Sequence, residues 1–374
     1  MSFTQKKLDY IRLARSQNIG SINFFKFLEI CKCPTQAIKE IIDSQHKSFN
    51  QHIKLASLKD VESEIENAAK FGAKIITIFD KEYPPLLKEI SDPPPIITIK
   101  GKFELLTKER IIAIVGARNA SINSINFAKK IAFEIGQQGF TIVSGLARGI
   151  DCAAHQATLS SGTISVIAGG IDNIYPLENK NLYQKIYEKG VVISEQPFGS
   201  APLAKNFIKR NRIISGLAIG TLVIEAGLKS GSLTTANFAN DQGRQVFAIP
   251  GAPYDHRSMG CNKLIKEGAK IAENSNDILE EFSFFGQKFI EKPIKTTNNF
   301  LNGNQYPKDL RKNEKLAVNQ VQNKILKVLD YSGIELDNVI EATGLRVDEV
   351  KSNLLELELL QKIYTKNGAI FLKK

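Results

Sequence analysis

The sequence predicts an α/β fold: an extended Rossmann-like, doubly wound and mostly parallel sheet, with a small N-terminal helical domain and a C-terminal winged-helix domain. Three observations support it. From residue 110 to about residue 282, apolar strands, glycine-rich turns and helices alternate. The strands are continuous in apolar residues, which is typical of parallel strands covered on both faces. The last part of the chain instead reads as three helices and then two short strands.

The N-terminal part is predicted to be helical. Apolar residues recur at helical spacing within 8–16, 24–30, 37–43 and 61–72, which defines a helical domain over residues 1–72. Two extended apolar runs follow, at 74–80 and 92–101. The prolines between and within them forbid helix, so these runs are expected to form an approach to the next domain.

The central domain, 73–285, is expected to carry the parallel sheet. Strands are predicted at 111–116, 140–145, 163–170, 190–195, 221–226 and 245–251. Helices are predicted at 124–139, 153–162, 179–190, 210–218, 233–243 and 262–270. Such a repeat is typical of a doubly wound unit.

The C-terminal part divides into a linker and a domain. Residues 286–318 are rich in Asn, Lys, Gln and Pro and lack strong periodicity, which predicts a linker. The domain 319–374 follows, with a hairpin turning at Asn367 and Gly368. Three helices and a hairpin in this order predict a winged helix.

Composition excludes several classes of protein. The 374 residues are 43% hydrophobic without a run of eighteen apolar residues, and the N-terminus lacks an apolar signal segment. A cytoplasmic protein with no membrane contact is therefore expected. Four scattered cysteines favour neither a disulfide framework nor a metal site. The net charge of +11 favours polyanionic partners where it is clustered, although AT-rich coding also inflates lysine.

Ligands of an open α/β sheet bind beyond the carboxyl ends of its strands, so a binding site is expected in the turns after the strands. The first turn, 116–121, joins Gly116 to a helix start with Arg118 and Ser121 as side-chain donors, which suits a phosphate. The second, 144–151, holds Arg148, and Asp151 can cap its helix. Plain turn and cap chemistry explains each turn, taken singly, about as well.

Motifs for catalysis and cofactors are missing from the sequence. It contains neither G-x-x-x-x-G-K-[ST] nor G-x-G-x-x-G, so nucleotide hydrolysis and a dinucleotide cofactor are not expected. The four histidines are far apart, and G-x-S-x-G does not occur. No catalytic residue, metal ligand or cofactor is assigned.

Residues 203–212 form the segment richest in potential contacts. Four cations surround one aromatic residue, Phe207, and no carboxylate occurs between Glu195 and Glu225. Cations can meet phosphates while a base stacks on the ring without sequence preference, so this pattern favours single-stranded nucleic acid. Alternatively Phe207 is a core residue beside a solvated helix face. The residues assigned here to DNA binding are Lys205, Phe207, Lys209, Arg210, Asn211 and Arg212.

A further small-residue turn follows Glu225. Lys229, Ser230 and Gly231 lie at a helix start, where hydroxyl groups can cap the helix or hold an anion. Glu225 itself has two interpretations. It is a general base, as in hydrolases of similar fold, or, more commonly for a lone carboxylate at a strand end, it holds backbone N–H groups.

These segments, in this order, resemble the DprA/Smf (DNA-processing protein A) family over nearly the whole chain. The resemblance includes GARNAS at 116–121, SGLARGID at 144–151, NFIKRNRIISGL at 206–217 and EAGLKSGSLTTANFA at 225–239. The resemblance implies a Rossmann-like protein without known catalysis. It also implies a homodimer that binds single-stranded DNA in a basic pocket, protects it during natural transformation and hands it to the RecA recombinase.

Site roles follow from the resemblance position by position. Arg118 and the segment 210–212 would meet phosphates, Phe207 would stack on a base, and Lys205 would add a nearby contact. The chain departs from the family at Ile208, where proline is common, and retains only NIGS, 18–21, of the N-terminal helix-hairpin motif.

Two other functions remain open at this point. A nucleotide phosphoribohydrolase would use Glu225, but the P-G-G part of that enzyme motif is missing. A transcription regulator would use the C-terminal winged helix, but the segment 347–361, in the position of a recognition helix, is more acidic than basic.

Overall fold

The computed structural model describes residues 5–44, 53–283, 320–329, 333–359, 362–366 and 369–372. The chain divides into two compact units, unit 1 (1–290) and unit 2 (291–374). The predicted linker 286–318 and the hairpin turn at Asn367 and Gly368 lie outside the described residues.

Unit 1 is built on a nine-stranded sheet with the strand order β1-β2-β6-β5-β4-β3-β7-β8-β9. The strands are β1 (Lys74–Thr77), β2 (Ile96–Gly101), β3 (Ile111–Gly116), β4 (Thr141–Ser144), β5 (Thr163–Ile167), β6 (Val191–Ser194), β7 (Gly220–Ile224), β8 (Gln245–Ala248) and β9 (Lys270–Ile271). β3 to β9 are parallel, while β2 pairs antiparallel with β6, and β1 antiparallel with β2. The predicted fold class is confirmed. The two runs expected only to approach this domain are strands of the same sheet.

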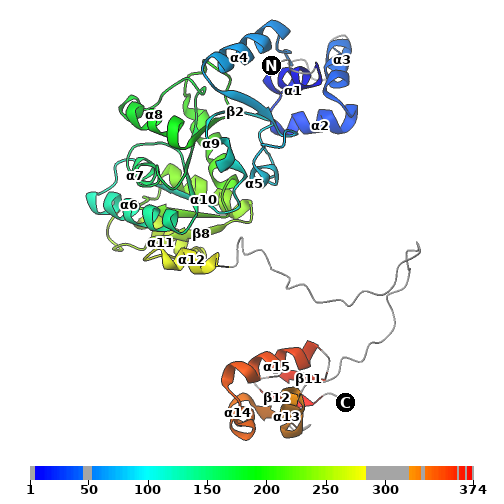
Figure 1. Cartoon of the computed structure of the whole chain (residues 1–374), viewed down its shortest axis with the longest axis vertical. Coiled ribbons are helices and arrows are strands. Elements are labelled where there is room, and N and C mark those ends of the chain that lie inside the picture. The colour runs from blue at the N-terminus through cyan, green and yellow to red at the C-terminus, as the bar shows by residue number, and fades with distance from the viewer. Residues whose placement is uncertain are drawn as a thin grey trace, which may run out of the picture. The chain divides into compact units, whose positions relative to one another are not determined.

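Helices cover both faces of the sheet because its strands are apolar on both sides. In β3, Ile112 and Ile114 pack towards α6 and α7, whereas Ala113 and Val115 pack with α9 and α10. The helices of this region are α5 (Pro85–Lys88), α6 (Ile122–Gln137), α7 (Ile150–Ala157), α8 (Lys180–Lys189), α9 (Ala204–Gly216), α10 (Gly231–Asp241), α11 (Met259–Lys266) and α12 (Asn276–Glu281). Figure 1 shows them around the sheet.

Four N-terminal helices lie beside the β1–β2 edge of the sheet (Figure 1). They are α1 (Gln5–Arg15), α2 (Ser21–Cys31), α3 (Pro34–Ser44) and α4 (Leu58–Lys70). Ile11 of α1 and Val61 of α4 share one apolar core with Ile75 and Ile96 of the sheet edge. This continuous core holds the helical region and the sheet together in one unit.

Unit 2 has the predicted winged-helix order. It contains α13 (Gln320–Val328), β10 (Ile334–Glu335), α14 (Leu336–Thr343), α15 (Val347–Leu359), β11 (Ile363–Lys366) and β12 (Ala369–Leu372). The strands form an antiparallel sheet in the order β10-β12-β11, and Ile325, Val339 and Leu357 lie in the core. Over the described parts of the whole chain, every helix is too short or too polar to cross a bilayer.

The buried histidine of α7 predicts an acid-dependent loss of stability. Nδ1 of His155 lies 2.6 Å from Oγ1 of Thr163, and burial, with a smaller contribution from the charge of Arg210, lowers the pKa of His155 to about 3. Between the ordinary pKa of about 6.5 and the folded value, only the unfolded chain binds this proton. The free energy of unfolding therefore loses nothing to His155 above pH 6.5, and it falls as the pH decreases from 6.5 towards 3.

This histidine is expected to make unit 1 about 2 kcal/mol less stable at pH 5 than at pH 7. His155→Gln should remove this contribution, because glutamine does not titrate. Urea unfolding of both proteins at the two pH values measures the difference. An equal pH dependence in wild type and variant would show that His155 is not kept neutral by the fold.

Candidate nucleic-acid interface

A pocket of about 740 Å³ lies beyond the carboxyl ends of β3 and β7. β3 pairs with β4 on one side and with β7 on the other, so this is the point where the strand order reverses and where open α/β sheets bind ligands. Seven residues predicted to bind DNA lie in its lining: Gly116, Arg118, Phe207, Arg210, Asn211, Ser230 and Gly231. Six lie outside the lining: Ser121, Arg148, Lys205, Lys209, Arg212 and Lys229.

The turn after β3 contributes Arg118 to the pocket. Gly116 begins this turn, and any side chain there would overlap the carbonyl oxygen and the side chain packed against it, from Ile224 and Ile150. Arg118 is exposed, and its guanidinium lies 5.4 Å from the centre of the Phe207 ring. A cation and an aromatic face from different elements are thus brought together.

Ser121 and Glu225 bind each other at the same strand ends. The Ser121 hydroxyl donates to Glu225 Oε2 at 2.6 Å, and the Ser121 amide lies 3.0 and 3.1 Å from the two carboxylate oxygens. The Ser121 hydroxyl also accepts from Ser124 N and so caps α6. Glu225 therefore anchors the turn through backbone and hydroxyl donors, and this geometry favours that interpretation over a general base.

The loop 144–149 is fixed from inside by two charged groups. The Asp151 carboxylate accepts from the amides of Gly145 and Ala147 at 3.1 and 3.3 Å. It therefore holds the loop rather than bonding the free amides at the start of α7. Burial raises the pKa of Asp151, which the positive charge of Arg210 opposes. Arg148 points elsewhere and forms an exposed ion pair with Glu178.

Arg210 supports the pocket from within the protein. It is 6% exposed, and Nη1 donates to the carbonyl oxygens of Gly145 and Val166. Burial lowers its pKa to about 10. A Cβ at Gly145 would lie 2.5 Å from the guanidinium, so loop and arginine are packed without spare room. This position differs from the phosphate contact expected from the sequence, because the guanidinium bonds buried carbonyl groups.

Arg212 is also buried and has carboxylate partners. Its Nε lies 3.0 Å from Asp92 and its Nη2 lies 2.6 Å from Glu195. The chain between Glu195 and Glu225 lacks acidic residues, but the fold brings carboxylates to Arg212 from that boundary residue and from the segment before β2. Two of the four cations of this segment are therefore structural.

The remaining cations of α9 are exposed. Helix α9 begins at Ala204, six residues earlier than predicted, and so includes Lys205, Phe207 and Lys209. Phe207 and Asn211 are half-buried on the pocket side, and Asn211 Nδ2 donates to Gly231 O at 3.2 Å. Within the described residues, no carboxylate pairs with Lys205 or Lys209, nor with Arg118 or Lys229.

Tyr175 also lines the pocket, although it is not among the residues predicted from the sequence. Its ring packs edge-on against Phe207 with 5.5 Å between the centres, and it remains 48% exposed. The available signal was an aromatic residue in the turn after β5. Tyr175, Phe207 and Arg118 together form one wall, which we call the aromatic wall.

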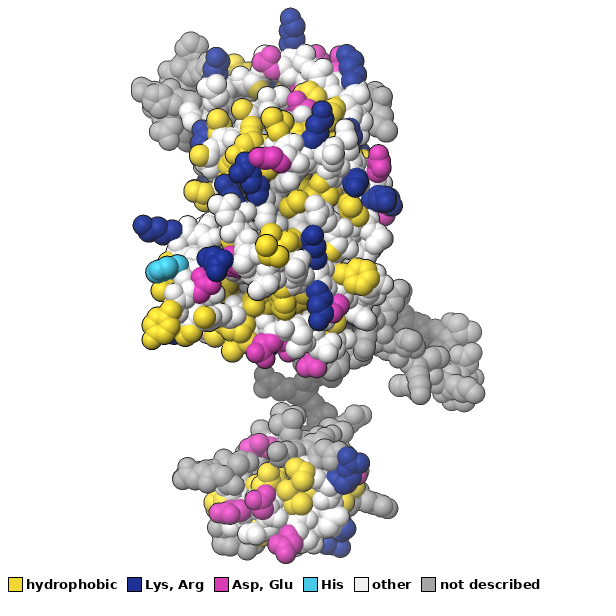
Figure 2. All heavy atoms as spheres, turned by 90° about the vertical axis from the view of Figure 1, so that its left-hand side faces the viewer, with side chains coloured by type: hydrophobic (Ala, Val, Ile, Leu, Met, Phe, Trp, Pro, Cys, Tyr) yellow, Lys and Arg dark blue, Asp and Glu magenta, His cyan; other side chains and the backbone are white. Residues whose placement is uncertain are grey.

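The start of α10 forms another part of the lining. Ser230 caps this helix through Oγ, which accepts from Ser232 N, and Gly231 is exposed. Lys229 lies on an adjoining smaller hollow of about 290 Å³ that shares Ser230. Over the face of unit 1 in Figure 2, Lys and Arg side chains alternate with hydrophobic and acidic ones. Net charge alone would not locate the pocket.

Family models match three parts of the chain. The model described as DNA recombination-mediator protein A matches residues 74–283. The DprA-like N-terminal HHH domain matches 4–67, and the DprA winged helix domain matches 312–368.

Similar proteins carry the same names. Protein Smf of Synechocystis is 34% identical over 322 residues, 81% of each chain, and the DNA processing protein DprA of Bacillus subtilis is 44% identical over 212 residues, 56% of this chain and 71% of its own length. The structure of DprA from Streptococcus pneumoniae superposes with a TM-score of 0.62 at 32% identity, over 75% of this chain and 99% of that chain. A DprA structure from Helicobacter pylori, described by its single-stranded DNA binding mode, gives 0.53 at 27% identity, over 57% and 96%.

Proposed function

Since the chain belongs to the DprA/Smf family of DNA recombination-mediator proteins, we propose that it binds single-stranded DNA in the pocket beyond β3 and β7. The aromatic wall is the observation that carries the proposal. Phe207 and Tyr175 offer ring faces or edges to a base, and Arg118 lies beside Phe207 with no acidic partner in the described part of the chain. A single strand can present both an unpaired base to the rings and a phosphate to the arginine.

The exposed lysines suggest a path for the sugar–phosphate backbone of the DNA. Lys205 and Lys209 lie one turn apart on α9, and Lys229 lies near the start of α10, so phosphates can be met on both sides of Phe207. Contacts of this kind recognise charge and stacking rather than sequence. A similar protein from Helicobacter pylori is described by its single-stranded DNA binding mode, which supports this assignment.

Fluorescence anisotropy with a labelled oligo-dT tests the proposal. We expect tight binding of the single strand, weaker binding of the corresponding duplex, and heavy loss with Arg118→Ala. Arg118 is exposed, so its replacement should leave the fold intact. Full affinity of the Arg118→Ala protein would contradict the assignment of this wall.

The two free lysines of α9 predict the salt dependence. Each phosphate contact releases counterions, so Lys205→Ala/Lys209→Ala should reduce the slope of log K against log salt by about 1.4. Lys189→Ala is the matched control, because Lys189 ends α8 just before β6 and thus lies at the opposite edge of the sheet. An unchanged slope in the double variant would exclude both lysines from the DNA path.

Family membership also supports a more detailed proposal. We propose that the chain acts without catalysis, as a cytoplasmic homodimer that protects incoming strands in natural transformation and loads a RecA recombinase. We retain the division into domains 1–72, 73–285 and 319–374 with the linker 286–318. Sedimentation tests the dimer, and RecA-dependent strand exchange on DNA coated by single-strand-binding protein, with and without this chain, tests loading.

A further inference from the structure

We propose that Arg15 and Glu64, two residues of the N-terminal helices, are positioning residues for the DNA pocket. They act on the segment 195–203, which runs from β6 to the start of α9 and which we call the junction loop. The proposal rests on the proposed function, since it assigns the N-terminal helices a part in single-strand binding. Its physical basis is a set of hydrogen bonds that connects α1 and α4 to the aromatic wall.

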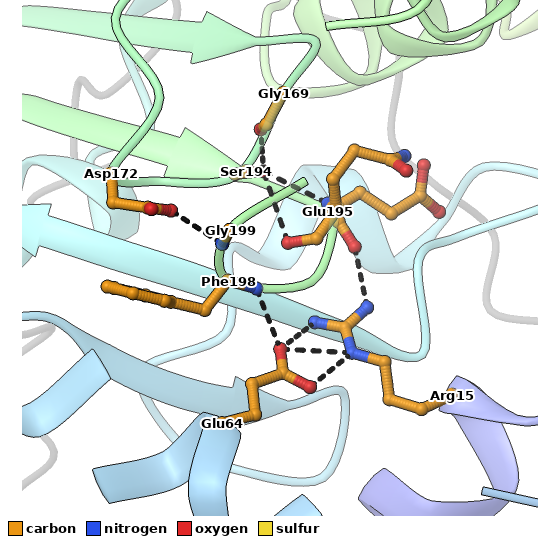
Figure 3. Close-up of polar contacts among 9 residues, drawn as sticks. Arg15, Glu64, Gly169, Asp172, Ser194, Glu195, Phe198 and Gly199 are labelled. Atoms are coloured by element: carbon orange, nitrogen blue, oxygen red, sulfur yellow. Dashed lines mark hydrogen bonds and ion pairs between the residues drawn. The ribbon is translucent and has the colours of Figure 1, made fainter. Parts of the chain in front are cut away.

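The helical side of this connection is a buried ion pair with two further contacts. Arg15 of α1 lies 2.8 Å from Glu64 of α4, and both side chains are about 10% exposed. Arg15 Nη1 also donates to the carbonyl oxygen of Glu195 at 2.8 Å, and Glu64 Oε1 accepts from the amide of Phe198 at 3.3 Å. Figure 3 shows both side chains reaching the junction loop. The pair thus holds the loop by one donor and one acceptor.

Additional contacts bind the same loop to the helical region. The Phe198 ring packs edge-on against Phe71, which follows α4, with 5.8 Å between the ring centres. The junction loop is also bonded to a second segment: Gly199 N donates to Asp172 Oδ1 at 2.8 Å, and Gly170 N donates to Ser200 O at 2.8 Å. These bonds connect the loop to the turn after β5.

The turn after β5 and the junction loop meet with little free space. A Cβ on Gly169 would lie 3.1 Å from Ser200 O, and one on Gly170 would lie 2.7 Å from Pro197 O. The turn continues to Tyr175, and the loop continues through Pro202, which lines the pocket, to Ala204. Both aromatic rings of the wall are therefore carried by segments that the loop fixes.

A second connection reaches α9 through Glu195. Its backbone oxygen accepts from Arg15, while its side chain pairs with Arg212 at 2.6 Å. Arg212 lies on α9, five residues after Phe207. Glu195 thus connects Arg15 of α1, through its carbonyl oxygen, to Arg212 of α9, through its carboxylate. Loss of Arg15 or Glu64 should therefore displace Phe207 relative to Arg118.

Three variants separate positioning from simple stability. Arg15→Glu/Glu64→Arg restores the ion pair but offers neither a donor to Glu195 O nor an acceptor for Phe198 N. Glu64→Gln keeps an acceptor for that amide, and Glu64→Ala removes it. Lys7→Met is the control, because it also removes an ion pair that holds α1 to the sheet region, here 2.8 Å from Asp80.

Affinity for oligo-dT, thermal melting and hydrogen exchange of residues 195–203 are measured for each protein. We expect the exchanged pair to melt near the wild type but to bind about tenfold more weakly, with faster exchange of the loop. Glu64→Ala should melt lower than the exchanged pair, because it leaves Arg15 without its carboxylate, but it should show the same tenfold loss of affinity. It tests the proposal if the exchanged pair does not fold. Glu64→Gln and Lys7→Met should bind like the wild type.

Wild-type affinity in both the exchanged pair and Glu64→Ala, despite faster exchange of the loop, would overturn the positioning role. So would equal weakening in Lys7→Met, because any loosening of the helices would then suffice. Failure of the wild type to bind oligo-dT would contradict the proposed function instead.

Discussion

Replacing Phe207 by alanine should raise the Kd for oligo-dT by about 5- to 150-fold, because stacking of one base on an aromatic side chain contributes about 1–3 kcal/mol. Phe207 is the member of the aromatic wall that contacts both others, Tyr175 and Arg118. Its removal therefore also leaves Arg118 without the ring that orients it. Anisotropy at fixed salt measures the change.

Phe133→Ala is the matched control for Phe207→Ala. Phe133 is 50% exposed on α6 and is not part of the pocket lining, so the same substitution should leave the affinity unchanged. Equal Kd values for the wild type and the Phe207 variant would refute the stacking role and leave only the cations as candidate contacts.

Arg210→Leu should destabilise unit 1 by about 3–5 kcal/mol, because it removes one partner from a buried polar cluster. The carbonyl oxygens of Gly145 and Val166 would lose their donor, and the buried Asp151 would lose the positive charge that favours its ionised form. Urea unfolding followed by circular dichroism measures the loss.

Arg148→Leu provides the comparison, since its ion pair with Glu178 is exposed and contributes less than about 1 kcal/mol. If Arg210→Leu were as stable as this control yet no longer bound DNA, Arg210 would contact phosphate directly, as the sequence alone suggested.

The parallel sheet could be predicted because its signal is local. Each of β3 to β8 is an apolar run followed by a glycine or small polar turn, and two such turns, at 116–121 and 225–231, do meet at the pocket. Arg118 and Phe207 were both assigned to DNA binding from the motif segments, and both line the pocket. Residue types and their spacing thus predict which segments lie at the carboxyl ends of the parallel strands.

The roles of individual charges could not be predicted in the same way. Lys209, Arg210 and Arg212 are almost adjacent in sequence, but helix α9 turns the lysine to solvent and the two arginines inward. Asp92, a partner of Arg212, lies 120 positions away in the chain. Burial and long-range partners decide whether a cation is free, and neither is visible in a local pattern.

Strands β1 and β2 determine how the protein can be divided experimentally. A fragment that starts at Arg110, where the repeating strand–helix pattern begins, would lack both strands. The β6 edge that pairs with Thr98 to Gly101 would then expose unpaired N–H and C=O groups next to apolar residues. Such an edge can pair with other chains, so a shortened protein should begin before β1. Aggregation of a fragment that starts at Arg110 would then indicate an unpaired sheet edge rather than a defect in DNA recognition.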